Sequence, residues 1–321
     1  MPANGGRLVT VVIPAHNAEA TIDETLLGVR AQTHRALEII VVDDGSRDRT
    51  SEIVAKHSGS DTRVTLLRQA NAGVAAARNH AIAASSADLI ATVDADDLWA
   101  ASKIERQIGA LERGGQSVGM VYCWSARIDE DSRVLDTSFR PTDEGDVLAR
   151  MCRGNLAGNA SSVLLRKTAV LEAGGYDPTL RARKAQGCED LLLYYRIAAR
   201  YRAAVVPAFL TGYRNTAGNM SSDSCQMLRS WRIVAAEMRA YHPDLEQHIR
   251  AGEDYAADWL LRRNDLPLLS IRRLRSALRM TRRPASDIPC ELGTPGVELG
   301  QRFEIGRLFA GDHDDSSSPR R

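Results

Sequence analysis

The sequence predicts an α/β fold in which a parallel sheet is flanked by helices. The first hundred residues contain four short runs rich in Val, Ile and Leu, at 8–13, 38–42, 64–67 and 88–93, and helical patterns separate them. Strands that alternate with helices pair in parallel, because each helix returns the chain across the sheet. With 321 residues, 44% of them hydrophobic, the chain is also long and apolar enough to bury such a core.

The first helix is expected between the first two strands. Ile22, Leu26 and Val29 form one apolar stripe at helical spacing. Thr21 and Glu24 have the spacing of a capping box, in which each side chain bonds the other residue's backbone N–H. The pattern therefore predicts a helix that starts soon after Asn17.

The regular alternation ends near residue 130. A helix through Ile104, Ile108 and Leu111 is expected to lead into a strand at 118–124 and an acidic turn at 129–132. The irregular part that follows predicts a short helix to 153, a strand at 161–165, a helix to 173 and, after a Gly-Gly break, a loop to 189. Loops carried by a sheet commonly hold binding residues.

The C-terminal third has a different composition. Residues 225–280 look helical and are rich in arginine, whereas the chain after 283 is rich in Pro, Gly, Asp and Ser, which predicts disorder. The arginines concerned are Arg262, Arg263, Arg272, Arg273, Arg275 and Arg279. They allow a peripheral membrane contact with anionic lipid or a homodimer contact, and a solvated helix face is the alternative. No internal repeat is present, so one α/β domain with a helical appendage is expected.

Charge and cysteine content exclude several classes. The formal net charge is +1, from 42 basic and 41 acidic residues, so nothing indicates a nucleic-acid partner. The five cysteines have neither metal-ligand spacing nor the density of a disulfide framework, so reduced thiols are expected. No apolar run is long enough for a signal peptide or a membrane span. These features predict a cytoplasmic location.

The strongest chemical signal is an acidic turn after the fourth predicted strand. Asp94, Asp96 and Asp97 place three carboxylates in four positions. Mg²⁺ takes oxygen ligands and commonly binds through one or two carboxylates together with substrate phosphates, so the turn suits a metal-bridged diphosphate. The alternative is an acidic turn that caps the next helix.

A second acidic turn follows the second predicted strand. Asp43 and Asp44 precede Gly45, whose freedom at positive φ permits the bend. Open parallel sheets bind ligands at the carboxyl ends of their strands, so both acidic turns are expected to border one crevice. A plain strand-to-helix turn is the alternative for this motif alone.

These motifs, in this order, resemble glycosyltransferase family 2. The resemblance rests on residues 12–17 (Val-Ile-Pro-Ala-His-Asn), 41–46 (Val-Val-Asp-Asp-Gly-Ser), 71–73 (Asn-Ala-Gly), 77–79 (Ala-Arg-Asn), 94–97 (Asp-Ala-Asp-Asp), 174–177 (Gly-Gly-Tyr-Asp), Glu189-Asp190 and Arg196. It covers about the first 215 residues. It implies the GT-A fold, with a mixed, mainly parallel sheet, and an inverting transfer from a UDP- or dTDP-sugar that depends on Mn²⁺ or Mg²⁺.

The resemblance also implies a nucleotide pocket. Pro14, Ala15 and Asn17 would line it, and Asp44 would contact the base while Asp43 supports the turn. Arg78 would face the pyrophosphate or a base edge. The alternative for Arg78 is an ion pair with an aspartate of the acidic turns.

The remaining roles concern metal and catalysis. Asp96 would bind the metal directly, with Asp94 as its partner or near the ribose, and Asp97 would assist or cap the following helix. Asp190 would be the general base and Glu189 its support, the alternative being that this acidic pair only opens a helix at its positive end. Arg214, in a segment expected to close over the diphosphate, would bind phosphate.

The sequence patterns and the resemblance together predict the domain organisation. Residues 1–222 would form the glycosyltransferase domain, with a nucleotide-binding half at about 1–125 and an acceptor-binding half at about 126–222. A helical extension would span 223–282 and a disordered tail 283–321. The partners would be a nucleotide-sugar donor and a saccharide, lipid-linked or small-molecule acceptor, in polysaccharide, glycolipid or other glycoconjugate biosynthesis. A non-catalytic module of the same fold and a retaining transferase remain alternatives.

Overall fold

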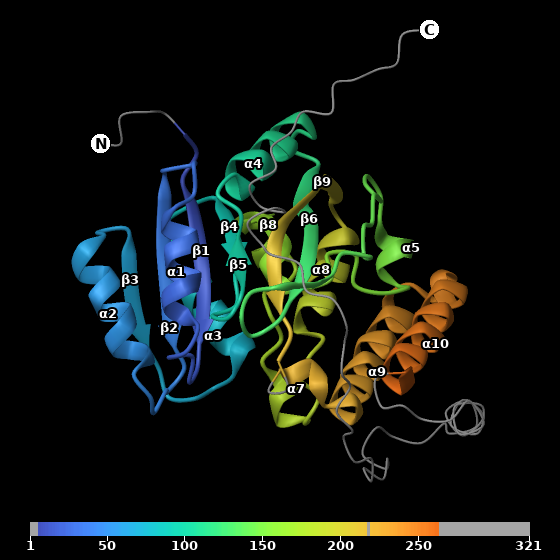
Figure 1. Ribbon diagram of the computed structural model, residues 1–321. Coiled ribbons are helices and arrows are strands. Elements are labelled where there is room, and N and C mark those ends of the chain that lie inside the picture. Colours follow the sequence, from blue (N-terminus) through green and yellow to red (C-terminus); the bar gives the residue numbers. More distant parts are fainter. Residues whose placement is uncertain (1–5, 217–218, 263–321) are drawn as a thin grey trace, which may run out of the picture.

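A single sheet forms the centre of the computed structural model, which describes residues 6–216 and 219–262 (Figure 1). Within those residues the sheet has nine strands in the order β3-β2-β1-β4-β8-β6-β9-β5, with β7 paired to β6. The strands are β1 Val9–Ala15, β2 Leu37–Asp43, β3 Val64–Arg68, β4 Leu89–Thr92, β5 Leu98–Trp99, β6 Val118–Ile128, β7 Val134–Asp136, β8 Val163–Arg166 and β9 Arg202–Arg214.

The first four strands are parallel and confirm the alternation predicted from the sequence. β1 pairs with β2 on one side and β4 on the other, and β2 pairs with β3. The crossovers are α1 (Ile22–Arg30), α2 (Thr50–Ser60) and α3 (Val74–Ala84). Because the strands run the same way, the turns after them lie at one edge of the sheet.

The second half makes the sheet mixed. β8 lies antiparallel between β4 and β6, so β6 runs in the direction of β4, and β9 runs parallel to β6. The short β5 and β7 are antiparallel to β9 and β6. The 13-residue β9 was not predicted from the sequence, because Pro207 interrupts it. The register slips between Cys123↔Val206 and Trp124↔Phe209, and this bulge accommodates the proline.

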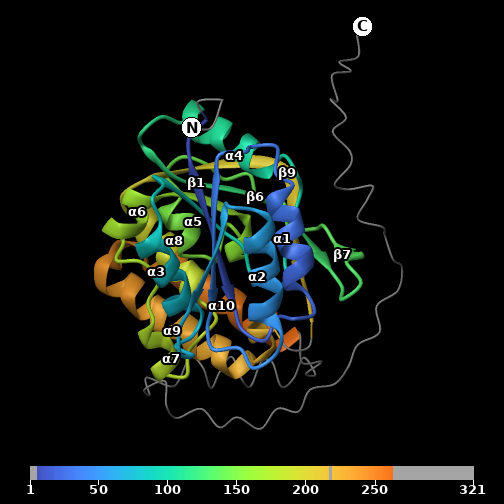
Figure 2. The ribbon, with the colours of Figure 1, turned by 90° about the vertical axis from the view of Figure 1, so that its left-hand side faces the viewer.

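Helices cover both faces of the sheet (Figure 2). One hydrophobic cluster joins alternate strand residues such as Val11 and Ile39 to α1, α2 and α4 (Lys103–Arg113). The other joins Val12 and Ile40 to α3 and to several C-terminal helices. These are α5 Leu148–Met151, α6 Lys167–Glu172, α7 Thr179–Ala182, α8 Glu189–Ala198, α9 Ser224–Tyr241 and α10 Glu246–Arg262. Two 3₁₀ turns, η1 Ala160–Ser162 and η2 Met220–Ser222, precede β8 and α9. Two covered faces explain why the strands carry nearly continuous apolar runs.

The predicted capping box of the first helix is wrong. α1 starts at Ile22, and its N-cap residue Thr21 makes no capping hydrogen bond. The Thr21 hydroxyl instead donates to the Ala95 carbonyl at 2.9 Å, in the acidic turn after β4. Glu24 accepts from Arg214 rather than capping the helix. Both side chains are thus taken by contacts with residues distant in the sequence.

The C-terminal appendage is a helical hairpin, formed by α9, the 3₁₀ turn η3 (Pro243–Leu245) and α10 (Glu246–Arg262). Arg239 of α9 pairs with Glu246 and Glu253 of α10, and Arg196 of α8 holds Glu237 of α9 at 2.6 Å. The predictions for residues 263–321, including the disordered tail and the arginines from Arg263 on, fall outside the described residues. Among the helices that are described, none combines the length and the apolar character needed to cross a membrane.

Candidate active site

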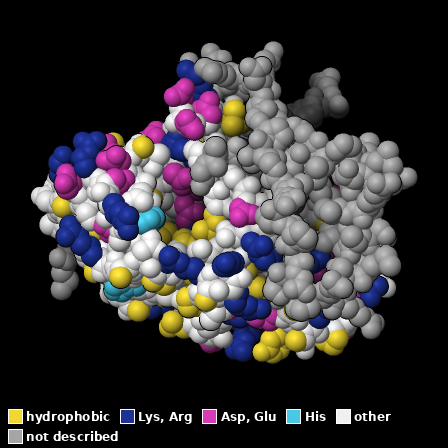
Figure 3. All heavy atoms as spheres, turned by 90° about the horizontal axis from the view of Figure 1, so that it is seen from below, with side chains coloured by type: hydrophobic (Ala, Val, Ile, Leu, Met, Phe, Trp, Pro, Cys, Tyr) yellow, Lys and Arg dark blue, Asp and Glu magenta, His cyan; other side chains and the backbone are white. Residues whose placement is uncertain are grey.

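The expected site residues gather at the edge where the parallel strands end. Seen from below, that edge is a hollow with acidic side chains at its centre and basic side chains around it (Figure 3). The turns after β1, β2, β3 and β4 reach this edge, and α3 carries Arg78 over it. The first turn of α8, with Glu189 and Asp190, completes the cluster.

Asp44 ties the second acidic turn to the loop after β3. Its carboxylate accepts from the backbone N–H of Ala72 at 2.7 Å and of Gly73 at 2.8 Å, and from Gln69 Nε2 at 2.8 Å. Gly73 has φ of 94°, a conformation that favours glycine, so the loop passes close beneath the carboxylate. Asp44 therefore organises the expected base pocket in addition to lying in it.

The residues expected to line the pocket come from the end of β1. Pro14 and Ala15 are buried in the strand, where they pair with Val42 and Asp43 of β2. Asn17 is exposed and has φ of 50°. Its backbone N–H donates to Ser46 Oγ at 3.0 Å and its Oδ1 accepts from the Arg47 N–H at 2.9 Å. Asn17 thus fixes the β1 turn against the β2 turn at the rim.

Arg78 forms the ion pair that was the alternative prediction for it. Its Nη2 lies 2.5 Å from Asp94 Oδ1, and its guanidinium lies 5.0 Å from the centre of the Tyr176 ring. Burial acts to lower the pKa of Arg78, but the Asp94 carboxylate, together with smaller contributions from other neighbouring groups, raises that pKa above its usual value. The Arg78 Nε is buried and has no hydrogen-bond partner among the described residues. A cation is thus fixed beside the first aspartate of the acidic turn.

Asp96 and Asp97 have different surroundings. Burial, followed by the charge of Asp94, raises the pKa of Asp96 to about 6, and no described side chain donates to its carboxylate. Asp97 is fully buried and accepts from Ser161 Oγ at 2.5 Å and from the Arg214 N–H at 2.8 Å. Burial raises the pKa of Asp97 well above its usual value. Asp97 therefore anchors the turn, and Asp96 is left free at the crevice.

The carboxylates of Asp94 and Asp96 suit a metal ion that is bound jointly by the protein and by a ligand. Among the described residues, no group of three or more His, Cys, Asp or Glu side chains is arranged to hold a metal ion. Asp96 has no side-chain partner and lies beside Asp94, whose side chain is 29% exposed. One or two carboxylates completed by phosphate oxygens is the usual arrangement for Mg²⁺, so these residues fit a metal brought in with a diphosphate.

Asp190 lies in the first turn of α8. It accepts from the Leu191 N–H at 2.7 Å and from Asn155 Nδ2 at 2.8 Å. Burial raises the pKa of Asp190 to about 6, and the opposing charge of Arg78 limits that rise. Glu189 is buried and accepts from the Gly187 N–H at 2.7 Å, so its carboxylate closes the loop before α8. The acidic pair therefore opens the helix and also places one carboxylate beside Arg78.

Arg214 does not face the crevice as expected. Its side chain is 1% exposed, and its nitrogens donate to the carbonyls of Asp96, Asp129 and Glu130. They also donate to Glu24 and Ser132. All five N–H groups of the guanidinium are thus engaged. This arrangement argues against the predicted contact with phosphate and favours a role for Arg214 under the acidic turn.

Three residues at the site escaped the sequence analysis. Ser161 donates to Asp97 and accepts from the Asp94 N–H, Asn155 donates to Asp190, and Tyr176 stacks on Arg78. Tyr176 belongs to the Gly-Gly-Tyr-Asp motif, but the motif by itself indicates no contact with Arg78. Ser161 and Asn155 carry no sequence signal, because their partners are 35 to 67 positions away.

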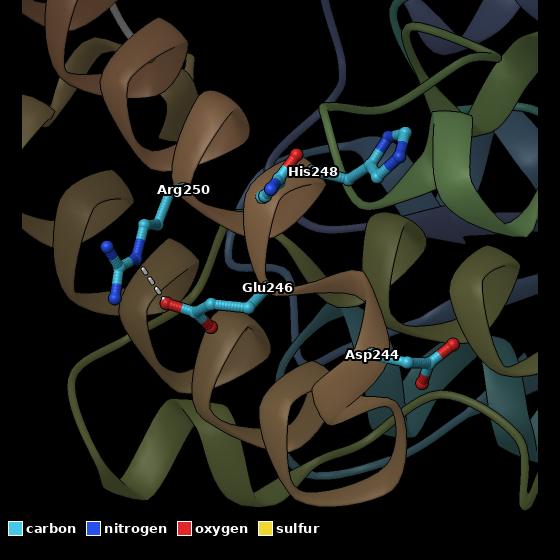
Figure 4. Close-up of a pocket in the computed structure, with 5 residues that line it drawn as sticks. Asp244, Glu246, His248 and Arg250 are labelled. Atoms are coloured by element: carbon cyan, nitrogen blue, oxygen red, sulfur yellow. Dashed lines mark hydrogen bonds and ion pairs between the residues drawn. The ribbon is translucent and has the colours of Figure 1, made fainter.

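A surface hollow elsewhere does not overlap this site. It lies where η3 leads into α10 and is lined by Asp244, Glu246, Gln247, His248 and Arg250 (Figure 4). Arg250 pairs with Glu246 at 2.5 Å, so these two charged side chains of the hollow neutralise each other. None of the residues singled out from the sequence lines it.

Comparison with known proteins tests the resemblance. The model of the family described as "Glycosyl transferase family 2" matches residues 10–174, which include both acidic turns and Arg78. The chain belongs to this family. The predicted family is thus confirmed, and it is a family of glycosyltransferase enzymes.

Curated relatives in the family match shorter stretches. The chain is 41% identical over 105 residues to the UDP-Glc:alpha-D-GlcNAc-diphosphoundecaprenol beta-1,3-glucosyltransferase WfgD of Escherichia coli, covering 32% of this chain and 41% of that protein. It is 36% identical over 102 residues to the putative teichuronic acid biosynthesis glycosyltransferase TuaG of Bacillus subtilis (strain 168), covering 32% and 40%. The matches therefore span less than half the length of these relatives.

Solved structures confirm the predicted fold. S. aureus TarS 1-349 in complex with UDP has a TM-score of 0.61 at 15% identity, covering 84% of this chain and 79% of that one. The mannosyltransferase PcManGT from Pyrobaculum calidifontis, in complex with GDP-Man and Mn2+, has a TM-score of 0.60 at 20% identity, covering 86% and 81%. At these identities the likeness establishes the GT-A fold.

Proposed function

We propose that this chain is an inverting, metal-dependent glycosyltransferase that moves a sugar from a nucleoside diphosphate to a hydroxyl acceptor. The observation that carries the proposal is the placement of Arg78. It bonds Asp94 directly, and its charge also acts on Asp190. One crevice thus holds the acidic turn expected at the donor phosphates and a carboxylate able to take a proton.

Asp190 is the proposed general base. With a pKa of about 6 it is ionised at neutral pH, yet basic enough to share the proton of an acceptor hydroxyl as that oxygen attacks the anomeric carbon. Attack from the side opposite the leaving diphosphate inverts the anomeric configuration. A retaining double displacement needs a carboxylate nucleophile on the other face, and the chain's acidic turn is assigned to the phosphates instead.

Asp96, with Asp94 beside it, is the proposed holder of Mn²⁺ or Mg²⁺. A bound divalent cation supplies positive charge to the departing diphosphate. The chain's own contribution is to keep Asp96 free of side-chain partners while Asp97 and Arg214 hold the turn from below. Arg78 offers a second cation on the same side of the crevice.

The donor is proposed to be a UDP- or dTDP-sugar, bound against Pro14, Ala15, Asn17 and the Asp44 turn. Support comes from the neighbour that binds UDP and from the relative that uses UDP-Glc. The acceptor is proposed to be a saccharide, with a lipid-linked one favoured by the diphosphoundecaprenol in that relative's name. Cell-surface polysaccharide biosynthesis at the cytoplasmic face of a membrane is the corresponding role.

Calorimetric titration with UDP, dTDP and GDP, each with Mn²⁺ and again with EDTA, tests the donor and the metal. We expect one uracil or thymine nucleotide to bind only with metal, and Asp96→Ala to weaken that binding at least tenfold. Asp190→Asn should bind like the wild type but transfer no sugar. Nucleotide binding with full transfer by Asp190→Asn would remove the proposed base, and no binding by any variant would favour the non-catalytic alternative.

A further inference from the structure

The loop at 152–159 is the structural feature behind this inference. It connects α5 to η1 and carries Asn155, whose side chain bridges two groups. Asn155 Oδ1 accepts from the Ala157 N–H at 3.1 Å, and Asn155 Nδ2 donates to Asp190 Oδ2 at 2.8 Å. Because the first contact needs an acceptor and the second a donor, together they fix the orientation of the amide.

The C-terminal hairpin holds this loop from outside. Gly252 of α10 has no room for a side chain, since a Cβ there would overlap the Cys152 carbonyl oxygen and lie 2.7 Å from Trp231 Cζ2. Arg153 Nε donates to His248 Nδ1 of α10 at 3.0 Å. The α10 backbone therefore lies directly against the chain two to three residues before Asn155.

The same hairpin holds the other side of Asp190. The Cys188 N–H donates to Ser230 Oγ of α9 at 3.1 Å, and Gly187 lies against the Met227 sulfur. Arg196, further along α8, is paired with Glu237 of α9. Both segments that determine the place of the Asp190 carboxylate are thus packed on the hairpin.

We propose that Asn155 is a positioning residue that orients the Asp190 carboxylate, and that the α9–α10 hairpin acts on catalysis by holding the Asn155 loop. The inference rests on the proposed function only in calling Asp190 the base. A hydrogen-bond donor to a carboxylate favours its ionised form. The Asn155 amide therefore sets both the orientation of the Asp190 carboxylate and its pKa. The hairpin then has a role distinct from binding a substrate.

Several groups besides the Asn155 amide affect the pKa of Asp190. Burial is the largest effect and raises the pKa of Asp190, as do Glu189 of α8 and Asp94 of the acidic turn, whereas Arg78 of α3 and the Leu191 N–H lower it. The hydroxyls of Tyr176 and Tyr194 and the Cys188 thiol are buried nearby with raised pKa values, so they remain neutral near pH 7. Loss of the Asn155 donor therefore leaves Arg78 as the main group that favours the charged form.

The test is the titration of the Asp190 carboxyl carbon by ¹³C NMR on the full chain, with the resonance assigned by its absence in Asp190→Asn. We expect Asn155→Ala to raise the pKa by about one unit, and Asn155→Asp, which faces one carboxylate with another, to raise it further. Gly252→Ala should raise it in the same direction, and should add nothing in the Asn155→Ala background. Gly59→Ala is the matched helical control, because a Cβ there meets nothing within 4 Å.

A measurement on the wild type avoids any effect of substitution on folding. The Asn155 side-chain amide protons should titrate with the same pKa as Asp190, and the acid limb of kcat/KM should shift alkaline in Asn155→Ala with activity recovered at high pH. An amide that does not titrate, or an unchanged Asp190 pKa in a folded Asn155→Ala, overturns the inference. Full transfer by Asp190→Asn overturns the proposed function instead, and leaves the carboxyl titration valid.

Discussion

Replacement of Asp190 by Asn should abolish transfer and stabilise the fold. In the folded chain, burial raises the pKa of Asp190 from 3.8 to about 6. A raised pKa of an acid means that the folded state disfavours the ionised form, so the charge costs stability above the usual pKa. A shift of about two units corresponds to about 3 kcal/mol once both states are ionised.

The amide does not recover the whole of that energy. The Asp190 carboxylate accepts two hydrogen bonds, one on each oxygen, from Asn155 and from the Leu191 N–H. The amide side chain in the Asp190→Asn variant has a single oxygen, so it can keep only one of these two hydrogen bonds. Loss of one such hydrogen bond costs about 1 kcal/mol. We therefore expect Asp190→Asn to be more stable by about 1–2 kcal/mol at pH 8, which is a few degrees in melting temperature for a domain of this size.

The pH dependence separates this cause from a packing effect. The advantage should be absent below about pH 4, should grow between pH 4 and 6, and should be constant above pH 6. Urea unfolding of the wild type and of Asp190→Asn from pH 4 to 8 measures it, with the exposed Asp146→Asn as control. An advantage that does not change over this range, or a less stable variant at pH 8, would refute the assignment of a strained charge to Asp190.

Three other predictions use different readouts. For the wild type, kcat/KM should fall about tenfold per pH unit below about pH 6, because the base must be ionised. Arg78→Met should move that limb to higher pH and weaken nucleotide binding, since Arg78 lowers the pKa of Asp190. Arg214→Met should cost about 3 kcal/mol in urea unfolding, because three carbonyls lose their donor, whereas the exposed Arg113→Met should change little.

Local periodicity is sufficient for the N-terminal half of the fold. β1 to β4 and α1 to α3 lie where the alternating runs placed them, because each element there is continuous in sequence and is buried on one stripe or two faces. It failed for β9, whose Pro207 and alanines weaken the strand signal and whose stability comes from pairing with β6 along ten register positions. It failed equally for the two-residue β5, which is too short to carry a pattern.

The site divides along the same line. Residues that belong to an ordered motif, such as Asp44, Asp94 and Asp190, receive predicted roles because the resemblance fixes them in sequence, and those roles stay predictions. Residues that act through a distant partner were missed or misassigned. Arg214 is the sharpest case, because an arginine near a proposed diphosphate is indistinguishable in sequence from one that satisfies buried carbonyls. Its place was decided by the return of β9 beneath the acidic turn, which puts Arg214 against Asp97 and Glu24 across 117 and 190 positions.

The hairpin extends this argument to catalysis. A helical appendage with a charged surface suggests a docking element when only its sequence is considered. In the structure, α10 contributes a glycine where the Cys152 backbone approaches, and α9 contributes Ser230 where the chain enters α8. Each contact is weak by itself, but both act on segments that end at the same carboxylate, so their effects on Asp190 should be coupled rather than additive. A substitution on α10 that leaves nucleotide affinity unchanged and moves the pH profile would therefore place the appendage within the catalytic machinery.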